Sequence, residues 1–141
     1  MLASSLTENC LTMSFRSTFA EIRSVLSLVL ADKTIQRLGS DLSHDLELVL
    51  AEALNNVAEH AYGEGIPGQV SLSVMIENGL VRTEIRDYGR PFLGFSARRD
   101  VASPEEEGGR GILLMRSICR SVDHRRQGDE NILTLELVSS S

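Results

Sequence analysis

The chain has 141 residues, a net charge of -6 and 42% apolar residues, a composition typical of one soluble globular domain with its own core. The acidic balance argues against direct nucleic-acid binding, and no apolar run is long enough to span a membrane. Cys10 and Cys119 are far apart and lack metal-ligand spacing, which favours free thiols in the cytoplasm. We expect a flexible N-terminus at residues 1–10, one domain at 11–138 and a tail at 139–141.

The first elements are predicted from hydrophobic periodicity. Residues 11–17 alternate apolar and polar side chains, which indicates a strand. Residues 19–38 carry apolar side chains at helical spacing, and Gly39 is well placed to end that helix. Ser40 or Asp41 can cap the helix that follows.

The next predicted helix carries two stripes of side chains over residues 46–62 and ends near Gly63. One stripe is apolar, with three- and four-residue spacing. The other places Glu52, Asn56 and His60 four residues apart, so these side chains stack along one face. Such a row is either a candidate site or a solvated helix face, and spacing alone leaves both interpretations open.

The second half of the chain alternates strand patterns with glycine-rich turns, and Asn78-Gly79 is a strong signal for a two-residue hairpin turn. In order, we predict a loop at 63–68, strands at 69–76 and 81–85, a turn at 87–92, a loop at 93–108, a helix at 112–122, and a hairpin of strands at 122–126 and 132–138 around a turn at 128–131. This order predicts an α+β fold with helices on one face of a mostly antiparallel sheet.

Three segments carry groups that would suit a nucleotide with a bound magnesium ion. Asn56 offers an oxygen ligand for Mg²⁺, and Glu52 could accept a proton from a hydroxyl. Asp87 ends a predicted strand, where it could accept from an exocyclic amine, and Gly89 would let the backbone approach a base. Glycines before a helix can form an anion site, and those here are Gly108, Gly109 and Gly111.

Each segment alone also has an ordinary explanation. Asp-x-Gly is commonly a turn, and a run of glycines is often a linker. The glycine run lacks the Lys-Ser/Thr ending of a P-loop and the spacing of a dinucleotide-binding motif. The order of the three segments is far more specific than any one of them.

Together these segments resemble the three boxes of the GHKL (Bergerat-fold) ATP-binding superfamily, most closely its anti-sigma-factor serine-protein kinase branch. Residues 52–62 (Glu-x-x-x-Asn-x-x-x-His-Ala-Tyr) resemble the N box, and residues 87–92 (Asp-Tyr-Gly-Arg-Pro-Phe) the G1 box. Residues 109–112 (Gly-Arg-Gly-Ile) resemble the G2 box. The resemblance covers residues 11–137 and implies a Bergerat-type two-layer sandwich.

The resemblance implies a role for each matching residue. Glu52 would be the catalytic base that activates a serine on a protein partner, and Asn56 would hold Mg²⁺. Asp87 would bind the amino group of ATP's adenine, with Gly89 beside the ring. His60 matches the motif, and we expect it to pack within the helix rather than act as a ligand.

The phosphate side of the nucleotide is assigned in the same way. Residues 93–108 would be the ATP lid. Amides of Gly109 and Gly111 would meet the phosphates. The arginines that are candidates for contact with the phosphates, or for solvent-exposed charge, are Arg98, Arg99 and Arg110.

Two positions depart from the pattern of this superfamily. Many members have a glycine where this chain has Pro91, which would stiffen the entrance to the lid. Many also place a threonine near the adenine where Asn131 approximately falls, and Asn131 could still hydrogen-bond through water.

The resemblance implies an ATP-dependent anti-sigma factor that phosphorylates a STAS-type anti-anti-sigma partner, binds a sigma factor and forms a homodimer. The alternative is a nucleotide-sensing module that binds a protein without phosphorylating it. A third interpretation, the catalytic part of a histidine kinase, would call for a helix pair with a phospho-acceptor histidine, which this sequence does not show.

Overall fold

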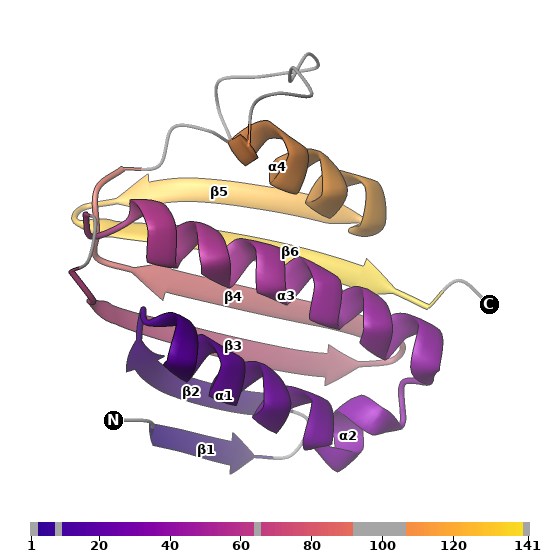
Figure 1. Ribbon diagram of the computed structural model, residues 1–141. Helices are drawn as coiled ribbons and strands as arrows, with labels where there is room; N and C mark the ends of the chain where they lie inside the picture. Colours follow the sequence, from indigo (N-terminus) through magenta and orange to yellow (C-terminus); the bar gives the residue numbers. More distant parts are fainter. Residues whose placement is uncertain (1–2, 8–9, 64–65, 92–106, 140–141) are drawn as a thin grey trace.

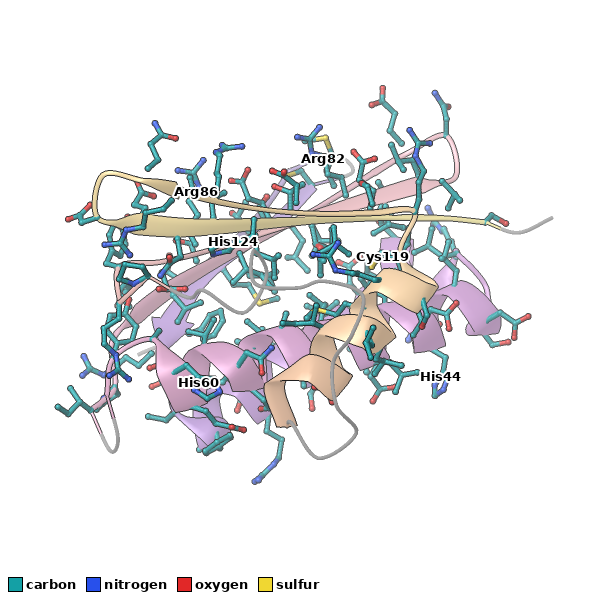
Figure 2. The ribbon with its side chains drawn as sticks, turned by 90° about the horizontal axis from the view of Figure 1, so that it is seen from above. His44, His60, Arg82, Arg86, Cys119 and His124 are labelled. Atoms are coloured by element: carbon teal, nitrogen blue, oxygen red, sulfur yellow. The ribbon has the colours of Figure 1, made fainter. Side chains whose placement is uncertain are left out.

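The protein is built from one antiparallel sheet with helices packed on one of its faces (Figures 1 and 2). The computed structural model describes residues 3–7, 10–63, 66–91 and 107–139. In this part of the chain the strands follow the order β1-β2-β3-β4-β6-β5. The elements are β1 (Ala3–Thr7), β2 (Cys10–Arg16), α1 (Phe19–Ala31), α2 (Lys33–Gln36), α3 (Ser40–His60), β3 (Gln69–Glu77), β4 (Leu80–Asp87), α4 (Glu107–Ile118), β5 (Ser121–Gln127) and β6 (Glu130–Val138). The predicted α+β two-layer fold is confirmed.

The core lies between the sheet and the helices. Alternate residues of each central strand point toward the helices, as the period of two predicts. Apolar side chains from α1, α3 and α4 meet them. The largest fully buried side chains in this layer include Phe15, Leu46, Leu50, Leu54, Leu72, Ile85, Met115 and Leu135. No helix in the described ranges has the length and apolarity that a membrane crossing would need.

Both predicted hairpins form, with turns that match their glycines. Asn78 and Gly79 have φ angles of 52° and 80°, the positive values that a type I′ turn requires. In the last hairpin Gln127 pairs with Glu130, so its turn is shorter than the expected 128–131. Asn131, which falls in that expected turn, is a residue of β6 instead.

The helical half differs from the prediction at two places. The single helix expected over residues 19–38 is divided at Asp32, whose Oδ1 accepts from the backbone N–H groups of Thr34 (2.9 Å) and Ile35 (3.2 Å) and so caps α2. The apolar pattern continues across this break, which hides it. At the start of α3, Gly39 is the capping residue, with a φ of 95° and no side-chain cap, in place of Ser40 or Asp41.

Helix α4 begins earlier and ends earlier than expected. It starts at Glu107, so the three glycines lie inside its first turns rather than before it, and it ends at Ile118 because β5 begins at Ser121. At the N-terminus, residues 3–7, which were expected to be flexible, form β1 and pair with β2. The expected lid, apart from residues 107 and 108, lies outside the described residues.

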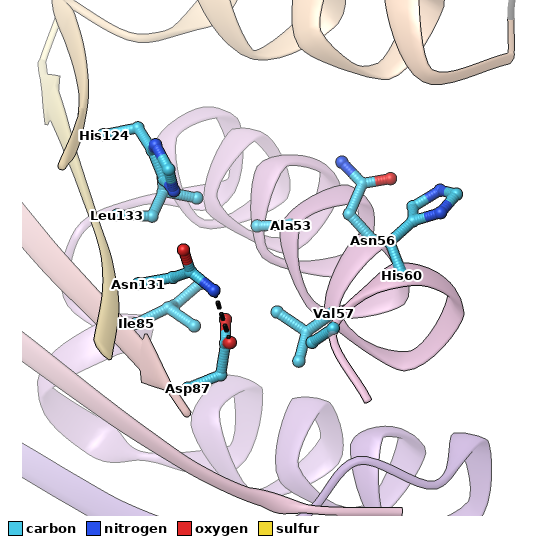
Figure 3. A pocket seen from close by; sticks show the side chains of 10 residues that line it. Ala53, Asn56, Val57, His60, Ile85, Asp87, His124, Asn131 and Leu133 are labelled. Carbon is cyan, nitrogen blue, oxygen red and sulfur yellow. Dashed lines mark hydrogen bonds between the residues drawn. The ribbon is translucent and has the colours of Figure 1, made fainter. Parts of the chain in front are cut away.

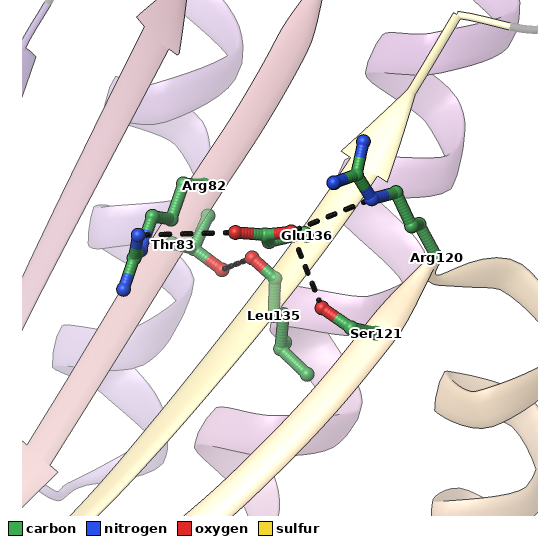
Figure 4. Close-up of polar contacts among 6 residues, drawn as sticks. All are labelled: Arg82, Thr83, Arg120, Ser121, Leu135 and Glu136. Atoms are coloured by element: carbon green, nitrogen blue, oxygen red, sulfur yellow. Dashed lines mark hydrogen bonds and ion pairs between the residues drawn. The ribbon is translucent and has the colours of Figure 1, made fainter.

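The second face of the sheet carries charged side chains, and none of the described helices packs on it (Figure 2). Glu136 lies between Arg82 (3.8 Å) and Arg120 (3.6 Å) (Figure 4). Arg86 contacts Glu84 (2.8 Å) and Glu130 (3.1 Å). Such partly exposed pairs stabilise a fold by little. Cys10 and Cys119 are both free thiols, as expected, and Cys119 is buried.

Candidate functional site

A pocket opens between α3 and the strand ends of β4, β5 and β6 (Figure 3). About 400 Å³ of space lies between its walls, and this volume includes open solvent. Its lining is divided equally between apolar and polar side chains. The lining residues are Ala53, Asn56, Val57, His60, Ala61, Ile85, Asp87, His124, Asn131 and Leu133.

Asp87 is the last residue of β4 and is 6% exposed. Its Oδ1 accepts two hydrogen bonds, from the backbone N–H of Gly89 (2.9 Å) and from Nδ2 of Asn131 (2.8 Å). The antiparallel register pairs Asp87 with Asn131, so strand pairing brings these two side chains together. Asp87 therefore presents a buried carboxylate to the pocket, in the place that the sequence predicts.

Glu52 and Asn56 lie one turn apart on α3 and meet α4 at Gly111. A Cβ atom added to Gly111 would lie 2.6 Å from Oε2 of Glu52 and 4.0 Å from Nδ2 of Asn56. A glycine at this position therefore leaves room for the carboxylate. Asn56 also lines the pocket, and its buried Nδ2 has no hydrogen-bond partner among the described residues. Asn56 thus lies one helical turn from Glu52 and also lines the pocket.

Gly89 is required by packing against the end of α3. A Cβ atom on Gly89 would collide with the backbone carbonyl of Ala61, and the N–H of Arg90 donates to the same carbonyl (2.6 Å). The guanidinium of Arg90 donates to the carbonyl oxygen of His60 (3.0 and 3.3 Å). The close approach at this glycine is thus between two backbone segments of the protein, and it positions Asp87.

Tyr62 is a positioning residue to which the sequence assigned no role. Its hydroxyl accepts from the N–H of Tyr88 (2.7 Å) and donates to the carbonyl of Gln69. This single side chain therefore links the residues after α3 to the start of β3 and to the end of β4. Its place beside His60 in the first motif was the only signal that could have identified it.

Removing this hydroxyl is expected to loosen the strand end that carries Asp87. Tyr62→Phe loses two hydrogen bonds and should lower the free energy of unfolding by about 1–2 kcal/mol. Urea denaturation followed by circular dichroism measures this change. Tyr88→Phe is the matched control, because the Tyr88 side chain is exposed and its bond to Tyr62 comes from the backbone. Equal stability of wild type and Tyr62→Phe would show that the link is unimportant.

His124 is a second pocket residue that sequence reasoning missed, because its strand β5 reads as a polar edge strand. Burial lowers the pKa of His124 below its ordinary 6.5, and this effect outweighs Asp87 and Asp123, which raise it, while Arg126 lowers it further. The folded protein therefore holds His124 neutral at a pH where the unfolded chain is already protonated.

A pH dependence of stability follows from this shift. As pH falls from above 6.5 toward the lowered pKa, the unfolded chain binds the additional proton, so stability should fall. His124→Gln has no imidazole at this position to bind that proton. The denaturation midpoint of wild type should therefore drop more than that of His124→Gln between pH 7.5 and 5.5. Parallel curves for the two proteins would contradict the assignment.

The remaining predicted residues are not all placed by the structure. The His60 side chain is 46% exposed at the rim of the pocket and lies 3.8 Å from Glu59, so it is not packed within the helix as expected. Gly109 falls in the first turn of α4. The side chain of Arg110 and the residues Arg98 and Arg99 lie outside the described part of the chain.

The chemistry of the site suits an adenine nucleotide. Its lining includes apolar side chains, and its buried polar atoms include two without partners among the described residues, Nδ2 of Asn56 and Oδ1 of Asn131. For Mg²⁺ the described residues offer few ligands. No group of three His, Cys, Asp or Glu side chains suited to a metal occurs in the described ranges. Asn56 would therefore share the ion with the phosphates and water, as is usual for Mg²⁺.

Comparisons with known proteins show which family the chain resembles in sequence. A family model described as a histidine kinase-like ATPase domain matches residues 15–137. The chain is similar to an anti-sigma F factor of Bacillus cereus, with 26% identity over 115 residues that cover 79% of this chain and 75% of the relative. It is also similar to the serine/threonine-protein kinase BtrW of Bordetella bronchiseptica, with 31% identity over 106 residues that cover 70% of this chain and 72% of the relative.

Solved structures with the same fold are more distant in sequence. The histidine kinase domain of a blue-light activated histidine kinase from Erythrobacter litoralis EL346 is 19% identical, with a TM-score of 0.51 over 84% of this chain and 59% of that chain. The catalytic domain of the histidine kinase ThkA is 14% identical, with a TM-score of 0.50 over 89% of this chain and 95% of that chain. At these identities the likeness concerns the fold alone.

Proposed function

Because this chain belongs to the histidine kinase-like ATPase domain family, we propose that it is an ATP-dependent anti-sigma factor and serine-protein kinase. The observation that carries the proposal is the carboxylate of Glu52 held against Gly111, one helical turn from Asn56 at the pocket. The proposed proton acceptor Glu52 and the candidate metal ligand Asn56 lie on α3, and Asp87, proposed to bind the adenine, lies at the end of β4. A site of this kind would transfer phosphate chiefly by positioning and charge neutralisation.

In this proposal each residue has one task. Asp87 accepts a hydrogen bond from the adenine amino group, and Asn56 supplies an oxygen to Mg²⁺. Bound ATP with Mg²⁺ supplies the phosphoryl group and the counter-charge for it. Glu52 takes the proton from a serine hydroxyl of the partner, which makes the hydroxyl oxygen a better nucleophile.

The first turn of α4 would complete the phosphate side. Free backbone N–H groups at a helix N-terminus favour anions, and Gly109 in the first turn would allow phosphates to come close. Gly111 lies one turn further along, where it makes room for Glu52. The arginines proposed to add charge here are Arg98 and Arg110.

We propose a cytoplasmic protein that works as a homodimer and binds a sigma factor. A STAS-type anti-anti-sigma protein would compete for it, and phosphorylation of a serine on that competitor would free the kinase to bind the sigma factor again. The names of its relatives support this assignment, since they include anti-sigma F factors and a serine/threonine-protein kinase.

The test is incubation with Mg-ATP and candidate STAS partners, followed by intact mass spectrometry of each partner. A phosphate-sized mass gain on one partner, absent without ATP, is the expected result. Binding of ATP and of a partner without any mass gain would favour a nucleotide-sensing module instead. No binding of ATP at all would overturn both functions.

A further inference from the structure

The side-chain amide of Asn131 is held in one orientation by its neighbours. Its Nδ2 donates to Oδ1 of Asp87 (2.8 Å) and to the backbone carbonyl of Arg90 (2.8 Å). Both partners are acceptors, so the NH₂ group must face them and the carbonyl group must face away. A flipped amide would place oxygen against two oxygens. The orientation therefore follows from chemistry and is not an arbitrary choice between nitrogen and oxygen.

The consequence is an unpartnered acceptor in the pocket. Oδ1 of Asn131 is buried, accepts no hydrogen bond from the described residues, and belongs to a side chain that is 3% exposed and lines the pocket. Both hydrogen bonds of Asp87 fall on its Oδ1, which leaves its Oδ2 for a ligand. Figure 3 shows the carboxylate and the amide side by side at the same wall of the pocket.

We propose that Asn131 is a specificity-determining residue, which together with Asp87 selects bases that carry an exocyclic amine. The inference rests on the proposed nucleotide site. It adds that two acceptors bind the exocyclic amine directly, with no water between Asn131 and the base. An exocyclic amine has two N–H groups, and Asp87 Oδ2 and Asn131 Oδ1 would each accept a hydrogen bond from one of them. A 6-oxopurine would turn its oxygen toward these two oxygens, and a buried acceptor that loses its donor is costly.

The experiment measures the affinity of wild type and Asn131→Ala for ATP and for purine riboside triphosphate, which lacks only the amine. Isothermal titration calorimetry without a protein partner provides both dissociation constants. Wild type should bind ATP about 100-fold more tightly than the analogue. In Asn131→Ala this preference should fall about tenfold, because one of the two hydrogen bonds to the amine is missing. Inosine triphosphate should bind wild type at least as weakly as the analogue without the amine.

The ratio of the two affinities separates recognition from structure. If Asn131 only supports Asp87, the substitution weakens both ligands equally and the preference stays near 100-fold, which would overturn the inference while ATP binding, and with it the proposed function, stands. If wild type binds neither ligand, the proposed function fails first and the inference fails with it.

Two further variants keep the test decisive. Thr134→Val changes a polar residue of the same strand on the opposite face of the sheet, and it should leave the preference unchanged. Asn131→Ser provides a second variant in case Asn131→Ala does not fold. Its hydroxyl can still donate to Asp87, but its shorter side chain brings no carbonyl to the pocket, so the preference should fall as in Asn131→Ala.

Discussion

Glu52→Gln is expected to reduce phosphoryl transfer to the protein partner about 10²–10⁴-fold while leaving the affinity for ATP within about twofold. The amide keeps the shape of the side chain and its fit against Gly111, but it cannot take a proton. Because the carboxylate lies outside the set of pocket-lining residues, nucleotide binding should be largely insensitive to it. The measurement is single-turnover transfer under saturating ATP, together with a binding isotherm for the nucleotide.

The control for this loss comes from the same helix. Glu47→Gln removes an equal charge from an exposed side chain of α3 that does not line the pocket, and it should transfer phosphate at the wild-type rate. Transfer at the wild-type rate by Glu52→Gln would remove the proposed base. Loss of ATP binding in Glu52→Gln would instead assign Glu52 to the nucleotide.

Gly89→Ala should have the second large effect, on stability and on nucleotide affinity together. The added Cβ would collide with the backbone carbonyl of Ala61, which belongs to the end of a helix and cannot rotate away as a flexible side chain can. Overpacking of this kind typically costs about 1–3 kcal/mol. The segment after β4 must move, and with it the N–H of Gly89 that binds Asp87. We expect a lower denaturation midpoint. ATP binding should weaken about tenfold or more, because the loss of one charge-assisted hydrogen bond has an effect of this size.

Gly79→Ala is the matched comparison at the other end of β4. Nothing lies within 4 Å of an added Cβ there, but the φ of 80° is unfavourable for alanine and should cost about 1–2 kcal/mol. Stability should therefore fall in both variants, and ATP affinity only in Gly89→Ala. Equal ATP affinity in the two variants would show that the contact with Ala61 does not position Asp87.

The fold was largely predictable because its signals are local. Strict alternation in β3 and β4 and the Asn-Gly turn between them predict that hairpin without any tertiary information. The division of α1 from α2 was missed because the apolar spacing runs through it, and the stop depends on one capping side chain, Asp32. In the sequence, one capping side chain is a weaker signal than an apolar pattern that continues without interruption.

The site was predictable only in part, since several of its features depend on residues distant in sequence. Asp87 and Asn56 stood out as chemical groups in motifs. The role of Asn131 depends on the pairing of β4 with β6, which brings together residues 44 positions apart. Gly111 was expected in a glycine turn before the helix, as part of an anion site, whereas the structure places it inside α4, where the absence of a side chain admits Glu52. Both facts concern contacts that local sequence does not encode.

The register between β4 and β6 also limits how this pocket can evolve. A shift of β6 by one residue would turn Asn131 to the opposite face of the sheet and would turn Leu133, Leu135 and Leu137 out of the core as well. Insertions or deletions within β6 would therefore disturb the core together with the pairing of Asp87 and Asn131. Under the proposed base recognition, nucleotide preference would change by substitution at positions 87 and 131, while the strand lengths around them stay fixed.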